Sequence, residues 1–157
     1  MHMLRQMLCI VIVLSATMTG FYYSNKLYIR KDTLQKFINE LKASVTQIRY
    51  SSDNLCDIFS DKFSGFEFCD EQPFLIQWNN LLKSYDSKLK KSDIKLLLSF
   101  AQNLGKADVN GEISHIQMYI DMLNDCVEDA KNNINSKSKL YRTLGLSFGL
   151  LISIMLL

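Results

Sequence analysis

Few side chains in this sequence are of the types that carry out acid–base or nucleophilic chemistry, and their spacing does not bring them together. The histidines are His2 at the N-terminus and His115 inside a helical pattern. Gly105-Lys106 lacks the upstream glycine that a phosphate-binding P-loop requires. No motif combines a nucleophile, a base and an orienting group, so we expect neither an enzyme nor a cofactor site.

Residues of metal-binding type are present, but their pattern favours other roles. The acids of one helical pattern fit a solvated face or a docking surface better than a metal site; they are Asp121, Asp125, Glu128 and Asp129. The four cysteines form no C-x-x-C and have no neighbouring histidine, which gives zinc little support. We expect reduced thiols in a cytoplasmic domain, and a Cys56–Cys69 pair if the domain faces outside.

Two apolar runs at the chain ends must position everything between them. Residues 6–25 contain no charge over 20 residues, about the length that a helix needs to cross the hydrocarbon core of a bilayer. A cleaved signal peptide is the alternative, but SATMTG carries no A-x-A site, and Phe21-Tyr22-Tyr23 suits a membrane interface. We therefore predict a transmembrane helix over residues 6–25.

The C-terminal run is shorter. Residues 143–157 would extend about 22 Å at about 1.5 Å per residue, which is short for a full span and also compatible with a buried core helix. The run has no polar face, and Tyr141 and Arg142 at the interface would absorb part of the mismatch. We predict a second transmembrane helix over residues 143–157.

Small residues recur at intervals of four in both runs. In the C-terminal run they are Gly145, Gly149 and Ser153, and in the N-terminal run they are Ala16 and Gly20. This spacing lets helix backbones approach closely in lipid, so we predict that the two runs pack against each other or against a partner's helix. The alternative is chance, because glycine is common in membrane helices.

Charge is segregated along the chain although the net charge is only +2, which gives no general case for binding nucleic acid. Residues 26–50 carry six basic side chains against two acids, and residues 131–142 carry four against none. Residues 83–95 are also basic, with five lysines and two acids, whereas residues 106–129 hold one lysine and six acids. Basic residues beside both apolar runs predict a cytoplasmic domain and attraction to anionic lipid; they are Lys26, Arg30, Lys31, Lys137, Lys139 and Arg142.

The segment between the runs, residues 26–142, reads as helices. An apolar stripe predicts a helix over 32–50 with Asp32 or Thr33 as its cap, and Leu55, Phe59 and Phe63 predict a shorter one. We expect a loop up to Pro73, with this proline at the first helical position.

The remaining helices follow from similar stripes. One is expected from Phe74 to Leu89, and another begins at a Ser92 cap and is closed by Gly105. The last stripe runs from Ile113 to Tyr141, with no glycine or proline before Gly145, so one helix is expected to continue into the C-terminal run. This stripe fits a bundle core, or alternatively an intermolecular coiled coil. The predicted fold is an all-α helical bundle domain flanked by N- and C-terminal transmembrane helices.

Four stretches together resemble the stage III sporulation protein AB family of endospore-forming bacteria. They are Thr19-Gly20-Phe21; Gln47-Ile48-x-Tyr50; Leu104-Gly105-x-x-Asp108-x-x-x-Glu112-x-x-His115-Ile116; and Lys139-Leu140-Tyr141-Arg142-x-Leu144-Gly145 with Gly149. They follow the family order from end to end, and the tail is the most specific. The chain departs from the pattern at Gln47, Asn54 and Glu112, where the family usually has Glu, a nearby Pro and Gln.

The resemblance implies a domain similar to the cytoplasmic domain of type II secretion F proteins. It also implies a mother-cell membrane protein, in the outer forespore membrane, within a secretion-like complex that joins mother cell and forespore. The complex's ATPase would be its partner. A membrane-tethered coiled-coil adaptor unrelated to secretion is the competing hypothesis, and the sequence leaves homo-oligomerisation open.

Overall fold

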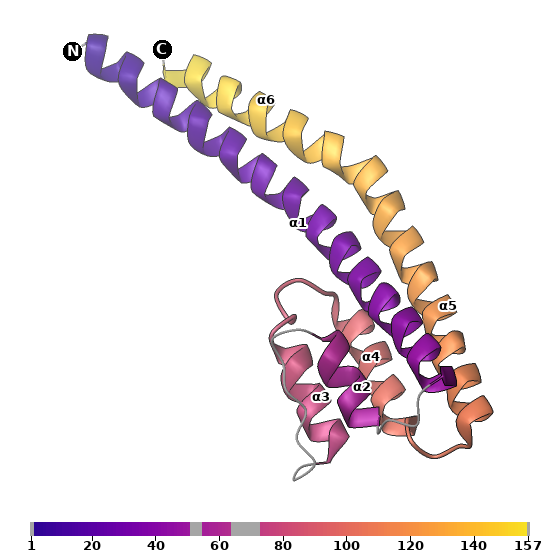
Figure 1. Cartoon of the computed structure of the whole chain (residues 1–157). Helices are drawn as coiled ribbons and strands as arrows, with labels where there is room; N and C mark the ends of the chain where they lie inside the picture. Colours follow the sequence, from indigo (N-terminus) through magenta and orange to yellow (C-terminus); the bar gives the residue numbers. More distant parts are fainter. Residues whose placement is uncertain (1, 51–54, 64–72, 157) are drawn as a thin grey trace. The chain divides into compact units, whose positions relative to one another are not determined.

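The computed structural model describes residues 2–50, 55–63 and 73–156, and within these helices the side chains of residues 2–10 and of scattered further positions lie outside the description. The elements run in the order α1 (His2–Tyr50), α2 (Leu55–Lys62), α3 (Phe74–Lys83), α4 (Lys91–Asn103), α5 (Val109–Asn133), a π-helical turn η1 (Ile134–Ser138) and α6 (Lys139–Leu156), as Figure 1 shows. The described residues form helices and turns without a strand, which confirms the all-α prediction.

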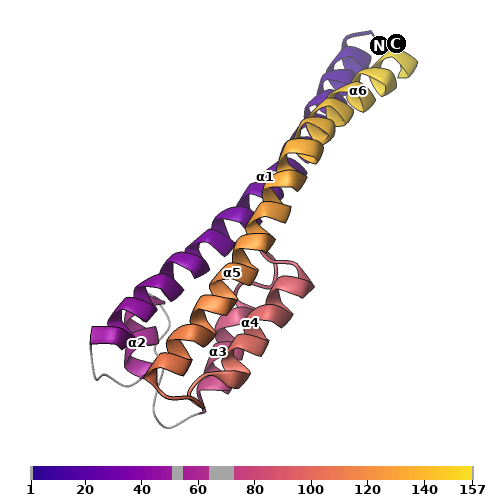
Figure 2. The same ribbon diagram turned by 90° about the vertical axis from the view of Figure 1, so that its right-hand side faces the viewer.

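The chain divides into two compact units. The first consists of residues 1–31 and 129–157, and the second consists of residues 32–128. In the first unit the N-terminal part of α1 and the whole of α6 run side by side in opposite directions, so the start of α1 and the end of α6 lie at one end of the unit (Figure 2).

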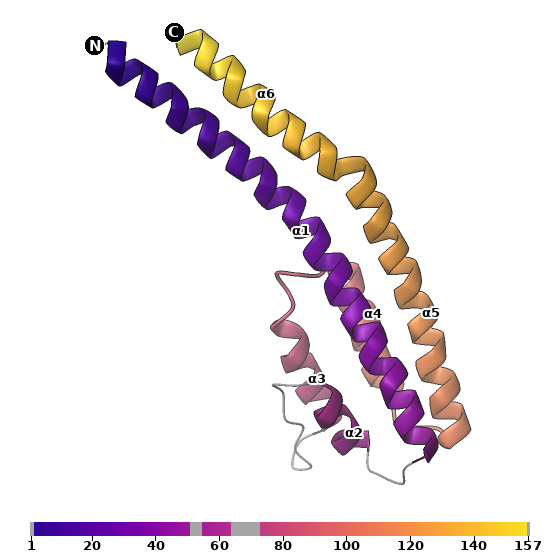
Figure 3. The ribbon, with the colours of Figure 1, turned by 45° about the horizontal axis from the view of Figure 1, so that its top comes forward.

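The second unit is a small helical bundle around an aromatic core. Trp78 of α3 is fully buried, and its Nε1 donates a hydrogen bond to the Leu97 carbonyl of α4 at 2.9 Å. Rings from four elements surround the indole with centroid distances of 5.2–6.2 Å; they belong to Phe37, Phe59, Phe63, Phe74 and Phe100. Every helix of the unit, α5 included, contributes buried side chains to one hydrophobic cluster. The ribbons of these helices are seen in Figure 3.

The predicted helix start at Asp32 or Thr33 is wrong, because α1 continues through this position without interruption. Thr33 is buried instead of capping a terminus. The segment from Phe21 to Tyr50 contains neither glycine nor proline, so nothing in it ends a helix that began upstream.

The boundaries of α3 and α4 also differ from the predicted ones. Pro73 is the N-cap of α3 and not its first helical residue, and α3 ends at Lys83, although Leu89 beyond it is buried. The N-cap of α4 is Lys90 and not Ser92, because the Asp93 carboxylate accepts a hydrogen bond from the Lys90 amide at 3.1 Å. Gly105 does close α4 in the left-handed region, with φ of 79°, as predicted.

The last stripe forms a continuous helical path, but it is not one regular helix. The π-helical turn over Ile134–Ser138 separates α5 from α6 and inserts one extra residue into the helical repeat. The sequence contains no proline or glycine at this turn, so no helix-breaking residue predicts it.

The predicted transmembrane helices over 6–25 and 143–157 are not confirmed. Among the described residues, we find no helix that combines the length and the apolarity needed to cross a bilayer. Of the Cys56–Cys69 pair that is expected if the domain faces outside, Cys69 and the side chain of Cys56 lie outside the described residues, whereas Cys126 is half-buried beside the core.

The aromatic core gives a first prediction, on Trp78. Replacing Trp78 by Ala should lower the free energy of unfolding of the full-length chain by about 3–5 kcal/mol, because it opens a cavity and leaves the Leu97 carbonyl without its donor. Thermal unfolding followed by circular dichroism measures the loss. The control is Leu75→Ala on the same helix, where the side chain is 39% exposed and the expected change is within about 1 kcal/mol. Equal melting temperatures for the two variants would contradict the assigned core.

Candidate functional sites: the terminal helix pair and the α4–α5 corner

The helices α1 and α6 of the first unit approach each other closely at Gly20. A Cβ atom built on Gly20 would lie 2.7 Å from the Tyr141 carbonyl oxygen and 3.5 Å from the Gly145 Cα. The first distance is too short for any side chain, and its partner is backbone that cannot rotate away. Gly20 is therefore required by the helix spacing and not by its own backbone conformation, which is helical.

One hydrogen bond and one aromatic contact continue this helix pair along the unit. The hydroxyl groups of Ser24 and Ser138 lie 2.7 Å apart and both side chains are buried. Ser138 is the last residue of the π-helical turn, so the turn sets the position at which this hydroxyl meets α1. The ring of Tyr141 lies 6.0 Å from that of Tyr23.

The structure corrects the predicted position of Arg30 at the membrane interface. We expected it among the basic residues at the membrane interface, but its side chain is only 8% exposed and donates to the Asp129 carboxylate at 2.8 Å. Asp129, which was expected on a solvated face or a docking surface, is the ion-pair partner of Arg30. Removing Asp129 from this part-buried pair would be destabilising, because the buried guanidinium of Arg30 would lose an ionic contact.

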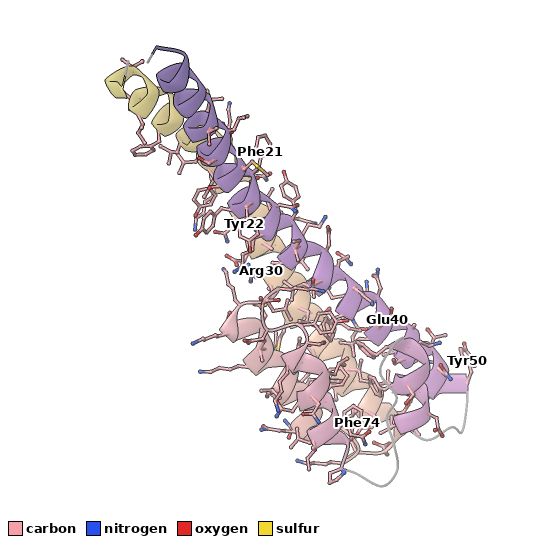
Figure 4. All side chains as sticks on the ribbon, turned by 90° about the vertical axis from the view of Figure 1, so that its left-hand side faces the viewer. Phe21, Tyr22, Arg30, Glu40, Tyr50 and Phe74 are labelled. Carbon is pink, nitrogen blue, oxygen red and sulfur yellow. The ribbon has the colours of Figure 1, made fainter. Side chains whose placement is uncertain are left out.

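The other basic residues predicted at the membrane interface are exposed or half-buried where their side chains are described. Lys26, Lys137 and Lys139 are exposed and Lys31 is half-buried. The aromatic side chains of Phe21 and Tyr22 are 58% and 70% exposed and project away from the helix pair (Figure 4). The side chains of Ala16, Arg142 and Ser153, and the surroundings of Gly149, lie outside the described residues.

The longest motif of the sequence folds into the corner between α4 and α5. Gly105 turns the chain, and Asp108 caps α5 by accepting a hydrogen bond from the Gly111 amide at 3.1 Å. Leu104 packs half-buried against the core. Each of these motif positions therefore has a structural role in ending one helix and starting the next.

Glu112 is the residue that holds this corner together. Its Oε1 accepts hydrogen bonds from the amides of Lys106 and Ala107 at 2.8 and 2.9 Å, while the side chain is 95% removed from solvent. Its Oε2 is buried without a hydrogen-bond partner among the described residues. A buried carboxylate oxygen without a donor is costly, so an amide in this place would satisfy the loop at a lower desolvation cost.

His115 is half-buried and packs against aromatic residues of the core. Its Nε2 donates to the Phe100 carbonyl at 3.2 Å, its ring stacks on Phe100 at 5.7 Å, and Tyr119 lies edge-on at 4.8 Å. Within the described part of the chain, no three side chains of His, Cys, Asp or Glu gather as metal ligands would.

Sequence reasoning identified Gly20, Gly105 and His115 but missed three contributors. The Ser24–Ser138 and Arg30–Asp129 contacts join residues 114 and 99 positions apart, and nothing local in the sequence pairs them. The capping role of Glu112 had a visible signal, since it stands near the start of a helix four residues after a capping Asp.

The fold and these two sites define an all-α protein in which the first unit is a pair of terminal helices and the second unit is a helical bundle. The family model for stage III sporulation protein AB (spore_III_AB) matches residues 66–157. The chain belongs to this family, and the membership supports a role in sporulation. Comparison with curated proteins finds no match, and comparison with solved structures finds none either.

The orphaned oxygen of Glu112 gives a second prediction. Glu112→Gln should keep the free energy of unfolding of the full-length chain within about 1 kcal/mol of the original, because the amide oxygen still accepts from both backbone amides. Glu112→Ala should cost about 2–3 kcal/mol, because both buried amides lose their acceptor. Urea unfolding curves of the two variants measure the difference. If Gln proves as destabilising as Ala, the carboxylate has a partner or role beyond these two hydrogen bonds.

Proposed function

We propose that this chain is a non-enzymatic membrane component of the sporulation-specific secretion-like complex between mother cell and forespore. In this proposal the helical bundle unit is a platform that couples the ATPase of the complex to the membrane assembly. Family membership supports the sporulation role, and the all-α bundle agrees with a domain similar to that of type II secretion F proteins.

The observation that carries the membrane part of the proposal is the close approach of α1 and α6 at Gly20. Helix pairs in lipid gain little from the hydrophobic effect and rely on backbone proximity at small residues. Gly20 and Gly145 supply such a contact between the two terminal segments that lack charge. The pairing also places both chain ends at one end of the unit, as two antiparallel membrane helices would.

The residues around this pair support an interface position. The exposed rings of Phe21 and Tyr22 suit the level of the lipid headgroups, where amphipathic aromatics are favoured. In the sequence, Lys26 follows the first uncharged run, and Lys137 and Lys139 precede the second; all three side chains are exposed. Lysines in this position favour contact with anionic lipid and a bundle unit on the cytoplasmic side of the mother-cell membrane.

A third prediction tests the helix pair and the function together. In a spore-forming host that carries only the variant gene, Gly20→Ile should leave the protein in the membrane fraction but abolish its co-purification with the other complex components and reduce spore formation. The added side chain must separate the helix backbones, at a packing cost of about 1–3 kcal/mol or more.

Met18→Ile is the matched control for this experiment. Met18 is 74% exposed, so a branched apolar side chain there adds no contact with α6 and sporulation should be normal. Normal complex assembly and sporulation with Gly20→Ile would contradict the packing role, and failure of both variants would show that the readout reports general damage. Normal sporulation without any gene product would refute the sporulation role itself.

A fourth prediction concerns the side of the membrane. A single cysteine at Ser87, an exposed position two residues after Tyr85, should remain unlabelled by an impermeant thiol reagent in intact mother cells when the native cysteines are replaced. It should label after permeabilisation, which serves as the positive control. Labelling in intact cells would reverse the orientation and make a Cys56–Cys69 disulfide plausible.

A further inference from the structure

A shallow groove on the second unit runs between α1 and α5 and is lined by both apolar and acidic side chains. Its apolar lining consists of Val45 and Ile113 together with Met118 and Met122, which are 47% and 43% exposed. Asp121 and Asp125 line the same groove, and Arg49 is its one cation among the described lining residues. The space amounts to about 650 Å³, enough to receive several side chains of a partner.

The acidic side chains of this groove make few hydrogen bonds or ion pairs within the described part of the molecule. Asp121 accepts a long hydrogen bond of 3.3 Å from Gln117, and Asp125 has no hydrogen-bond or ion-pair partner in the part of the chain that the structure describes. From Val109 to Glu128, α5 contains no lysine or arginine that would neutralise them.

The chemistry of this groove fits lysine side chains. A lysine lays its four-carbon stem on apolar surface while its ammonium group reaches a charged or solvated position. Methionine adapts its shape to such stems because its side chain is unbranched and flexible. A lysine entering the groove would therefore cover the methionines and place its charge beside Asp121 or Asp125.

The chain itself carries a surface of this kind, at the end of α3 and the beginning of α4. This lysine corner consists of Lys83, Lys88, Lys90, Lys91 and Lys95, and all five side chains are exposed. Of the two acids in this segment, Asp93 is fully buried and accepts the Lys90 amide, so only Asp86 offsets the surface charge. Lys91 and Lys95 stand one helical turn apart and present their charges together.

We propose that the groove between α1 and α5, which contains Met118 and Met122, receives the lysine corner of a second copy of this chain. The two surfaces differ, so the contact is head-to-tail, and each added copy offers a further groove or corner. Charge complementarity would set the register, and the buried methionine and lysine stems would supply apolar contact. The inference rests on the second unit alone and stands whether or not the proposed complex is correct.

The test is the association state of the purified full-length chain in non-ionic detergent, measured by sedimentation velocity at rising protein concentration. The original chain should self-associate, and high salt should weaken the association because exposed charges are screened. Asp121→Lys with Asp125→Lys, and separately Lys91→Glu with Lys95→Glu, should each weaken it about ten-fold or more.

Mixing the two double variants is the decisive arm. The first variant keeps its lysine corner and the second keeps its acidic groove, so an equimolar mixture should associate through these two unchanged surfaces where neither variant does alone. Lys36→Glu with Lys42→Glu is the matched control, because both lysines are exposed on α1 outside the groove and the change in net charge equals that of the second variant. This control should associate like the original chain.

Three results would overturn the proposal. One is an original chain that stays monomeric at every concentration, and another is a control that weakens association as much as Lys91→Glu with Lys95→Glu. The third is a mixture that does not restore association, which would mean that the groove and the corner do not face each other and that each meets a different partner.

Discussion

The first unit depends on the absence of a side chain at Gly20. With 2.7 Å between a Cβ at that position and the Tyr141 carbonyl oxygen, any other residue would separate α1 from α6. The Ser24–Ser138 hydrogen bond and the Arg30–Asp129 ion pair follow on the same pair of segments and require the same spacing. Neither contact bridges a wide gap, so both would be lost if the helices moved apart.

The second unit is organised differently, around rings instead of small residues. Trp78 is fixed at its polar edge by the Leu97 carbonyl and on its faces by neighbouring phenylalanines, so one residue ties α3 to α4 and to the rest of the core. The α4–α5 corner is held by buried Glu112, which accepts hydrogen bonds from two loop amides, and by His115, which donates to the Phe100 carbonyl of α4. The residues of the longest family motif thus have structural roles at the α4–α5 corner. Contacts with partners are therefore expected on other, exposed parts of the surface.

The helices of the second unit were predictable because apolar periodicity reports directly which side of a helix is buried. Gly105 was predictable for a different reason, since a left-handed residue at a helix end is most often glycine. The continuity of α1 was missed because Asp32 and Thr33 are good caps in isolation, and the packing of the stripe before and after them decided the outcome.

The contacts within the first unit were only partly accessible from sequence. Small-residue spacing pointed to Gly20 and Gly145, which lie against each other in the structure, and their role in lipid stays a prediction. Arg30 was assigned to the interface because a basic residue near an apolar run normally faces water, and its partner Asp129 is too distant in sequence to suggest otherwise. The π-helical turn has no local signature, because its residues, Ile134–Ser138, include neither glycine nor proline.

We propose that α1 and α6 form one antiparallel pair within the membrane assembly of sporulating cells. The most direct measurement is disulfide cross-linking of Ser24→Cys with Ser138→Cys, in a chain whose four native cysteines are replaced, within membranes prepared from sporulating cells. Because the two hydroxyl groups lie 2.7 Å apart, mild oxidation should convert most of the chain in the membrane fraction to an intramolecular cross-linked form. Recovery of the chain outside the membrane fraction, or the absence of the cross-link within it, would contradict the account.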